Sequence, residues 1–340
     1  MKQITNVFAW SLIKQQLLYS DNVNNLFCED ALNNEVPEKH NLSYRPTYFY
    51  QLLDNSIVIV DDINQPFSIY SGNKLLPFEM SDTGRIVIGK QDPRYLVLYK
   101  GAMEEKIYRV FDWVENKVCM EAEIPLTIVK GKAFTIGNGI LSCYTLNGEL
   151  SWQYKPAPAD PQFVHTDPAK IVGIYKNELW IKVNEKSFTV LDAATGKPIL
   201  ANFNLPDKLG TSFSMGDVNL DEQGSRLRIL AYLYYIEIDL VTHTAEIKKK
   251  YDDDWSIGLG RFYDRDAKVY FVGNNTRVRK SIGKIVAGIF NTDTLEVEWY
   301  YSLPGVEKNH FFVGQPQAND KYFAVKDSND TLYLFERGVH

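Results

Sequence analysis

The length, composition and charge of the chain already exclude several classes of protein. Its 340 residues, 45% of them hydrophobic and 13% aromatic, fit two average domains or one large all-β barrel or propeller, and flat aromatic rings favour strands. The net charge of −6 is opposite to the clustered basic face that nucleic-acid binding requires, so we expect no nucleic-acid partner.

The N-terminal segment predicts neither an export signal nor a membrane anchor. Its longest apolar run, Val7 to Trp10, is shorter than a signal-peptide core, and no later run approaches the length of a membrane span. Residues 9 to 18 could form a short helix. Three widely spaced cysteines, Cys28, Cys119 and Cys143, favour packed, reduced thiols over a disulfide framework. We therefore expect a cytoplasmic protein with no membrane partner.

Related β-hairpins recur along the chain. In the stretch LDAATGKPIL, residues 191–200, Gly196 stands where the end of the turn needs a positive φ. Similar hairpins are predicted at residues 69–78, 110–124, 143–154, 237–251, 289–303 and 332–340. Strands that precede the turns can also be recognised at residues 170–175, 178–184 and 226–232, and an inner hairpin with an Asp-rich turn at residues 261–273. Alternating strands and turn residues therefore indicate one repeated antiparallel unit.

The spacing of these hairpins predicts the architecture. The residues at the mouths of the turns are Ser71, Asp112, Thr145, Asp192, Asp239, Asn291 and Glu336. They lie 41, 33, 47, 47, 52 and 45 residues apart, and a period in the forties with room for four strands is typical of propeller blades. We predict an all-β fold, a seven-bladed β-propeller of four-stranded antiparallel blades that forms a single domain over residues 1–340, with seven repeats over 47–340.

The last predicted blade needs a strand from elsewhere in the chain. The repeat around Glu336 ends after its third strand, and an unpaired sheet edge there would be a liability. The N-terminal segment, residues 1–46, can complete this blade and close the propeller. We favour residues 4–10 for the closing strand, with residues 35–42 as the alternative.

Three of the hairpins resemble a known repeat. TVLDAATGKPIL, CYTLNGELSWQY and IFNTDTLEVEWYY are similar to the Asp-x-x-Thr-Gly-Lys-x-x-Trp hairpin that ends each blade of PQQ-type (quinoprotein dehydrogenase-like) β-propellers. Trp152 and Trp299 keep the tryptophan, and Leu200 replaces it. The resemblance implies that both tryptophans are buried between neighbouring blades. Relatives that bind the quinone hold it with adjacent cysteines, which this chain lacks, so we expect no quinone cofactor.

None of the sequence patterns that resemble catalytic or metal-binding motifs matches its motif fully or in a suitable context. The segment 217–226 begins like a calcium loop, but Glu222 and Arg228 occupy the positions that require glycine and glutamate, so an ordinary turn is predicted. Ser281 and Lys284 have the Ser-x-x-Lys spacing within a basic, glycine-bearing loop, where chance explains it. The five histidines show no metal-ligand spacing. We therefore predict no catalytic, cofactor-binding or metal-binding residue.

Two charged loops are the candidate partner-binding sites, and plain solvated loops are the alternative interpretation. The acidic loop contains Asp252, Asp253 and Asp254, and the basic loop contains Arg277, Arg279, Lys280 and Lys284. Function in such folds depends on loops rather than on the scaffold. We therefore expect a non-catalytic protein-interaction scaffold with another protein as its partner; the alternative is a hydrolase or lyase with a carboxylate or metal site in the central channel.

Overall fold

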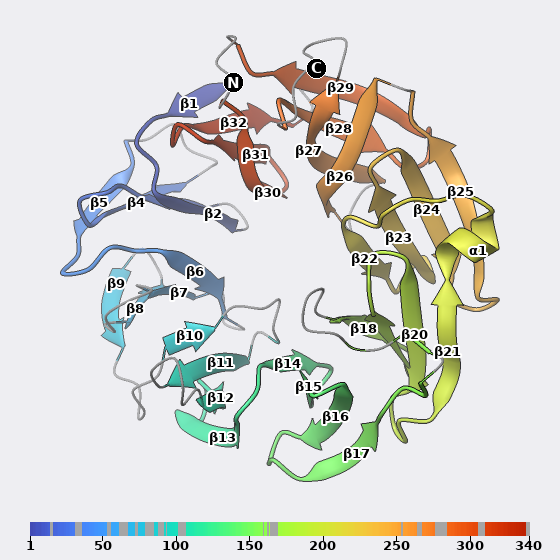
Figure 1. The fold of residues 1–340 in the computed structure, drawn as a ribbon. Helices are drawn as coiled ribbons and strands as arrows, with labels where there is room; N and C mark the ends of the chain where they lie inside the picture. The colour runs from blue at the N-terminus through green and yellow to red at the C-terminus, as the bar shows by residue number, and fades with distance from the viewer. Residues whose placement is uncertain are drawn as a thin grey trace. The chain divides into compact units, whose positions relative to one another are not determined.

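The computed structural model describes most of the chain. The described residues are 1–13, 16–30, 36–52, 56–60, 67–71, 74–78, 85–87, 92, 94–100, 107–158, 160–161, 163, 169–252, 254–263, 267–275, 284–304 and 310–337. They form four-stranded antiparallel sheets and one short helix (Figure 1). No helix among them is long and apolar enough to cross a membrane. The sheets belong to two compact units, Met1–Phe49 with Leu209–His340 and Tyr50–Lys208.

The unit that contains both termini holds four sheets. One contains β1 (Lys2–Ile4), β30 (Phe312–Ala318), β31 (Tyr322–Asp327) and β32 (Leu332–Glu336). The next contains β2 (Ala9–Ile13), β3 (Gln16–Ser20), β4 (Asn25–Asp30) and β5 (Glu38–Asn41). The others contain β22 (Val218–Asp221), β23 (Arg226–Ala231), β24 (Tyr234–Asp239) and β25 (Thr244–Lys250), and β26 (Trp255–Phe262), β27 (Lys268–Asn275), β28 (Val286–Asn291) and β29 (Glu296–Ser302).

The second unit also corresponds to four sheets. The first two contain β6 (Tyr48–Gln51), β7 (Ile57–Val60), β8 (Phe67–Ser71) and β9 (Lys74–Phe78), and β10 (Arg85–Val87), β11 (Tyr95–Lys100), β12 (Ile107–Asp112) and β13 (Lys117–Ala122). The last two contain β14 (Leu126–Val129), β15 (Lys132–Gly137), β16 (Ile140–Thr145) and β17 (Leu150–Tyr154), and β18 (Lys170–Tyr175), β19 (Glu178–Lys182), β20 (Ser187–Asp192) and β21 (Pro198–Asn204). The helix α1 (Leu205–Leu209) follows β21.

The predicted number of seven blades is wrong, because the described residues form eight four-stranded sheets. The additional blade, β2 to β5, lies within the segment 1–46 that we expected only to complete the last blade. The described part of residues 9–18, which we expected could form a short helix, belongs instead to the paired strands β2 and β3. The two-residue sequence between these strands contains no turn-forming residue type. Seven residues separate β4 from β5, whereas two to five residues separate the third and fourth strands of the other blades in which these strands are consecutive. The short hairpin that marks the other repeats in the sequence is therefore missing here.

The turns after the third strands follow the prediction closely. Each of the seven marker residues is the last residue of a third strand, from Ser71 of β8 to Glu336 of β32. The Asp192 Oδ1 atom accepts hydrogen bonds from the backbone N–H groups of Ala194 and Thr195, and Gly196 has a φ of 71°. Asp112, Asp239 and Asn291 accept equivalent bonds. A short side-chain acceptor at the turn mouth explains why Asp and Asn recur there.

An N-terminal strand completes the last blade, as expected, but it is shorter and earlier than predicted. β1 pairs antiparallel with β32, with Lys2 opposite Leu334 and Ile4 opposite Leu332 (Figure 1). The favoured closing segment, residues 4–10, contributes only Ile4 to this strand. The alternative segment, residues 35–42, supplies β5 of the additional blade instead.

Neighbouring sheets within each unit pack face to face through apolar side chains. The Trp152 side chain of β17 is 8% exposed, and its indole N–H donates to the Ala193 carbonyl of the next blade at 3.2 Å. The Trp299 ring of β29 meets the Phe335 ring of β32 edge to face, with centroids 4.9 Å apart, and is only partly buried. The predicted packing of both tryptophans between blades is therefore confirmed, whereas their predicted burial is confirmed for Trp152 alone.

Candidate partner-binding surface

The two predicted loops leave one sheet at the same end. The acidic loop connects β25 to β26, which begins at Trp255, and the basic loop follows Asn275, the last residue of β27. Trp255 and Asn275 are directly opposite each other in the β26–β27 pair. Antiparallel pairing therefore places side by side the strand residue at which the acidic loop ends, Trp255, and the one after which the basic loop begins, Asn275.

Only part of the predicted set can be placed. Asp252 and Lys284 are exposed, and Asp254 is partly exposed. Asp253, Arg277, Arg279 and Lys280 lie outside the described residues, as does Ser281 of the Ser-x-x-Lys spacing. The loops as partner-binding sites therefore stay a prediction, with Asp252 as their best-defined member.

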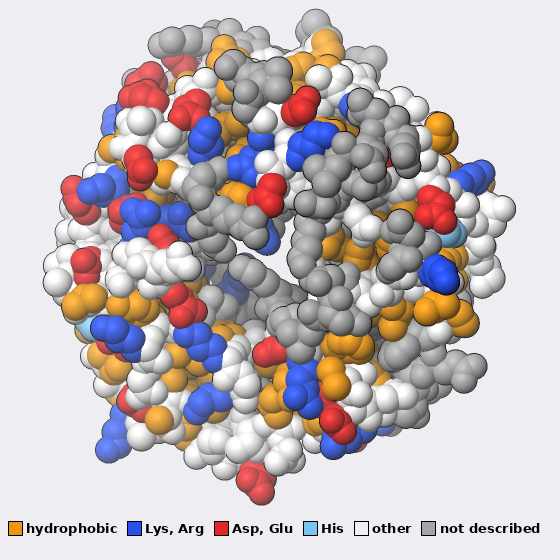
Figure 2. Space-filling view, turned by 180° about the vertical axis from the view of Figure 1, so that it is seen from behind, with side chains coloured by type: hydrophobic (Ala, Val, Ile, Leu, Met, Phe, Trp, Pro, Cys, Tyr) orange, Lys and Arg blue, Asp and Glu red, His pale blue; other side chains and the backbone are white. Residues whose placement is uncertain are grey.

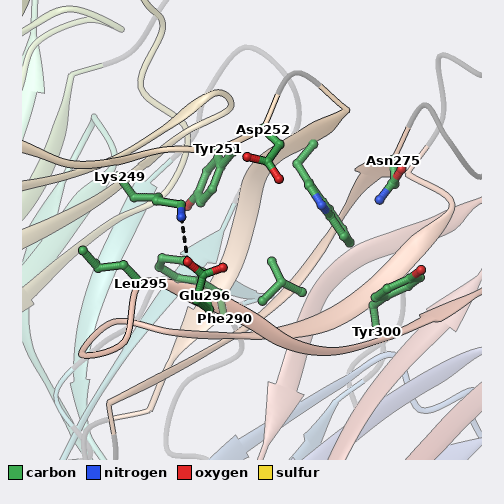
Figure 3. Close-up of a pocket in the computed structure, with 10 residues that line it drawn as sticks. Lys249, Tyr251, Asp252, Asn275, Phe290, Leu295, Glu296 and Tyr300 are labelled. Atoms are coloured by element: carbon green, nitrogen blue, oxygen red, sulfur yellow. Dashed lines mark hydrogen bonds and ion pairs between the residues drawn. The ribbon is translucent and has the colours of Figure 1, made fainter.

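A pocket of about 260 Å³ lies beside the acidic loop, between the β22–β25 and β26–β29 blades (Figure 3). Its lining residues are Lys249, Tyr251, Asp252, Trp255, Asn275, Phe290, Leu295, Glu296, Val297 and Tyr300. Aromatic rings form much of the wall: Trp255 and Tyr300 meet at 83° with centroids 5.3 Å apart, and Tyr251 meets Phe290 at 89° and 5.4 Å. Such edge-to-face pairs fix the orientation of each ring.

The charges around this pocket are not balanced. The Lys249 Nζ atom pairs with Glu296 Oε1 at 2.8 Å and joins the outer strands of the two blades (Figure 3). Among the described residues, no cationic group lies within ion-pair distance of the Asp252 carboxylate. Lys249 is paired with Glu296, so the Asp252 carboxylate is left without an ion-pair partner among the residues that the structure describes.

A buried hydroxyl lies in the wall of the same pocket. The Tyr251 side chain is 3% exposed, and within the described part of the chain its Oη atom has no hydrogen-bond partner. Burial raises the pKa of the phenol, so Tyr251 stays neutral and can both donate and accept a hydrogen bond. Unsatisfied buried polar groups are few in native proteins and often mark a place where a partner or water binds.

Exposed apolar side chains lie in the lining of the pocket and in the turn that is bonded to the acidic loop. Tyr232 and Leu233, in the β23–β24 turn, are 49% and 43% exposed, and Tyr300 is 47% exposed. The turn is held against the acidic loop, because the Leu233 carbonyl accepts a bond from Tyr251 N–H and the Tyr232 carbonyl accepts one from Ile257 N–H. We call the surface formed by Tyr232, Leu233, Asp252, Trp255 and Tyr300 the rim surface.

A second pocket differs in its electrostatics. It measures about 540 Å³, lies between the β26–β29 and β30–β32 blades, and is lined by Lys268, Tyr270, Ile289, Glu298, Trp299, Asp320 and Arg337. Lys268 pairs with Glu298 at 3.0 Å, and the Arg337 guanidinium lies over the Tyr270 ring at 4.9 Å. Asp320 accepts a bond from the Tyr263 hydroxyl. The charged groups of this pocket therefore already have partners within the chain.

The segments considered for metal binding form ordinary structure where they are described. The segment 217–226 makes the turn between β22 and β23, and Asp221 accepts hydrogen bonds from Gly224 N–H and from the Arg226 side chain. Its prediction as a turn is confirmed. Across the described ranges, no three histidine, cysteine or acidic side chains are grouped as metal ligands would be. On the face shown in Figure 2, Lys and Arg side chains are interspersed with Asp and Glu.

Comparison with solved structures supports a β-propeller fold. The C-terminal WD40 domain of Sif2 matches with a TM-score of 0.66 at 11% identity, covering 98% of this chain and 97% of that domain. Sqt1 from Saccharomyces cerevisiae matches with a TM-score of 0.62 at 10% identity, with coverage of 98% and 97%. The computationally designed Ika8 protein matches with a TM-score of 0.59 at 11% identity, with coverage of 98% and 96%.

These identities carry information about the fold alone. No family model matches the chain, and no curated protein sequence matches it significantly. The resemblance to PQQ-type repeats is therefore supported as far as the propeller fold and not as membership of that family.

Proposed function

We propose that the chain is a non-catalytic protein-interaction scaffold, built on a PQQ-like β-propeller, whose protein partner binds at the rim surface. The observation that carries this proposal is the exposure of Tyr300 in the lining of the pocket and of Tyr232 and Leu233 in the turn that is hydrogen-bonded to Tyr251 and Ile257 beside it. Neighbouring exposed apolar side chains with a polar border are characteristic of interaction sites. Tyrosine and tryptophan also dominate the binding free energy of many protein interfaces.

The blades beneath the rim surface provide a stiff support. Tyr235 and Tyr251 pack against Phe290 across the junction, each with centroids 5.4 Å apart. The loops above can vary without disturbing this core, which is how propellers are adapted to different partners. Cys28 and Cys143 are buried and are not joined in a disulfide, which suits the reducing cytoplasm that we propose as the location.

Site-specific photo-cross-linking in the cells that make the protein tests this proposal. p-Benzoylphenylalanine replaces Tyr300 or Tyr232 on the rim surface. Val241 is the matched control, because it is 62% exposed and lies in the β24–β25 turn at the far end of the same blade.

The proposal predicts that irradiation joins one discrete protein to the chain from positions 300 and 232. The same adduct is absent from position 241. Identical adducts at all three positions, or none at the two rim positions, would contradict a partner at the rim surface.

A further inference from the structure

We propose that the pocket at the rim surface binds the cationic side chain of a lysine or arginine in the partner protein. This inference rests on the proposed function and adds to it the chemistry of the group that is recognised. It follows from the size of the pocket, its aromatic walls and its charge.

The size of the pocket fits one side chain. Its volume of about 260 Å³ lies below the roughly 300–1,000 Å³ of clefts that enclose cofactors and other small molecules. It is also open at Asp252 and Tyr300, both of which are exposed. A long side chain that projects from a docked segment can enter from this opening, whereas the main chain of that segment remains over the rim surface.

The walls favour a cation. Trp255 and Tyr300 meet nearly at right angles, so they present two differently oriented aromatic surfaces to a group in the pocket. Aromatic faces attract ammonium and guanidinium groups through the ring quadrupole, and tryptophan is the strongest of them. The same rings contact the aliphatic stem of lysine or arginine, which is apolar.

The negative charge of Asp252 disfavours an acidic side chain in the pocket. Lys249 is paired with Glu296, and the Asp252 carboxylate has no ion-pair partner among the residues that the structure describes. An incoming lysine or arginine would supply that partner, whereas an acidic side chain would face the Asp252 and Glu296 carboxylates. The partner segment therefore carries a positive charge where it meets the pocket.

Fluorine NMR of the full chain labelled with 5-fluorotryptophan tests this inference. The chain has six tryptophans, and Trp255→Phe identifies the Trp255 signal. The probes are the N-acetyl methylamides of lysine, arginine and norleucine, where norleucine has a lysine-like stem without the charge. The other five signals report whether each variant is folded.

We expect a saturable shift of the Trp255 signal in the millimolar range with the lysine or arginine probe and none with norleucine. Asp252→Asn should weaken the response at least fivefold. The control Glu336→Gln, an exposed carboxylate at the end of β32, should change it less than twofold. A norleucine response equal to that of the cations, or a Trp255 signal that no cation shifts, would overturn the inference.

This experiment separates the two proposals. A cross-linked partner without a cation response at Trp255 leaves the scaffold standing and refutes the cationic pocket. A cation response without a rim-specific cross-link refutes the scaffold instead.

Discussion

Replacing Gly196 by alanine tests how one blade is held to the next. Gly196 has a φ of 71°, and a Cβ atom at this position would lie 2.5 Å from Cε3 and 2.6 Å from Cδ2 of Trp152. Trp152 comes from the preceding blade and donates its indole N–H to Ala193. Alanine would therefore meet both a backbone penalty and a steric clash with a buried ring that cannot easily move.

Gly139 provides the matched control. Its φ is 73°, and a Cβ atom there would meet nothing within 4 Å. Gly139→Ala should lower the free energy of unfolding by about 1–2 kcal/mol, which is the usual penalty when an L-residue adopts a left-handed conformation. Gly196→Ala should cost about 1–3 kcal/mol more, the range found when atoms are forced into a packed core.

Urea unfolding followed by circular dichroism and tryptophan fluorescence measures both free energies. Trp152→Ala, which should itself cost about 3–5 kcal/mol, completes a double-mutant cycle. In that background Gly196→Ala and Gly139→Ala should become equal, because the ring that makes the clash is gone. Equal costs of the two glycine substitutions in the parent, within about 0.5 kcal/mol, would refute this account of the blade contact.

Three further predictions concern stability. Trp299→Ala should cost about 2 kcal/mol in urea unfolding, less than the roughly 3–5 kcal/mol of a fully buried aromatic, because this ring is only partly buried; a cost as large as that of Trp152→Ala would contradict the partial burial. Deleting residues 1–4 removes β1 and exposes the edge of β32, so the melting temperature should fall, and an unchanged value would show that the blade does not need β1. Burial alone raises the pKa of Asp221, but hydrogen bonds from Gly224 and Arg226 outweigh it and hold the pKa below its ordinary value. The stabilisation by ionised Asp221 should therefore be present at pH 7 and be lost as the pH falls below about 4, so the stability difference between the parent and Asp221→Asn should shrink in acid. A difference that is constant from pH 7 to pH 3 would be inconsistent with this pKa.

Local turn chemistry made most of the fold predictable. Asp112, Asp192, Asp239 and Asn291 bind the backbone of their own turns, so each third strand ends on a residue that can be recognised in the sequence. The blade that contains β2 to β5 lacks this signal, because the sequence between β2 and β3 has no turn-forming residue type and the link between β4 and β5 is longer than in the other blades. Its strands are specified by pairing and by burial of residues such as Leu17 against the last blade, which no local pattern reveals.

The candidate site was predictable only where it depends on charge. The acidic run identified Asp252, but Tyr232, Trp255 and Tyr300 were missed because packing between two blades brings them together. One signal was present in the sequence. Tyr300 follows Trp299 in a strand, so its side chain points away from the blade contact that Trp299 makes, and an exposed tyrosine there could have been expected.

The central claim is that a protein partner binds at the rim surface, and its most direct test is the dissociation constant of the partner identified by cross-linking. Calorimetry with purified components compares the parent with Tyr300→Ala and Asp252→Lys, and Val241→Ala at the far end of the blade is the control. We predict at least a tenfold weaker affinity for both rim variants, which corresponds to about 1.4 kcal/mol, and less than a twofold change for the control. Equal dissociation constants for all four proteins would contradict the claim.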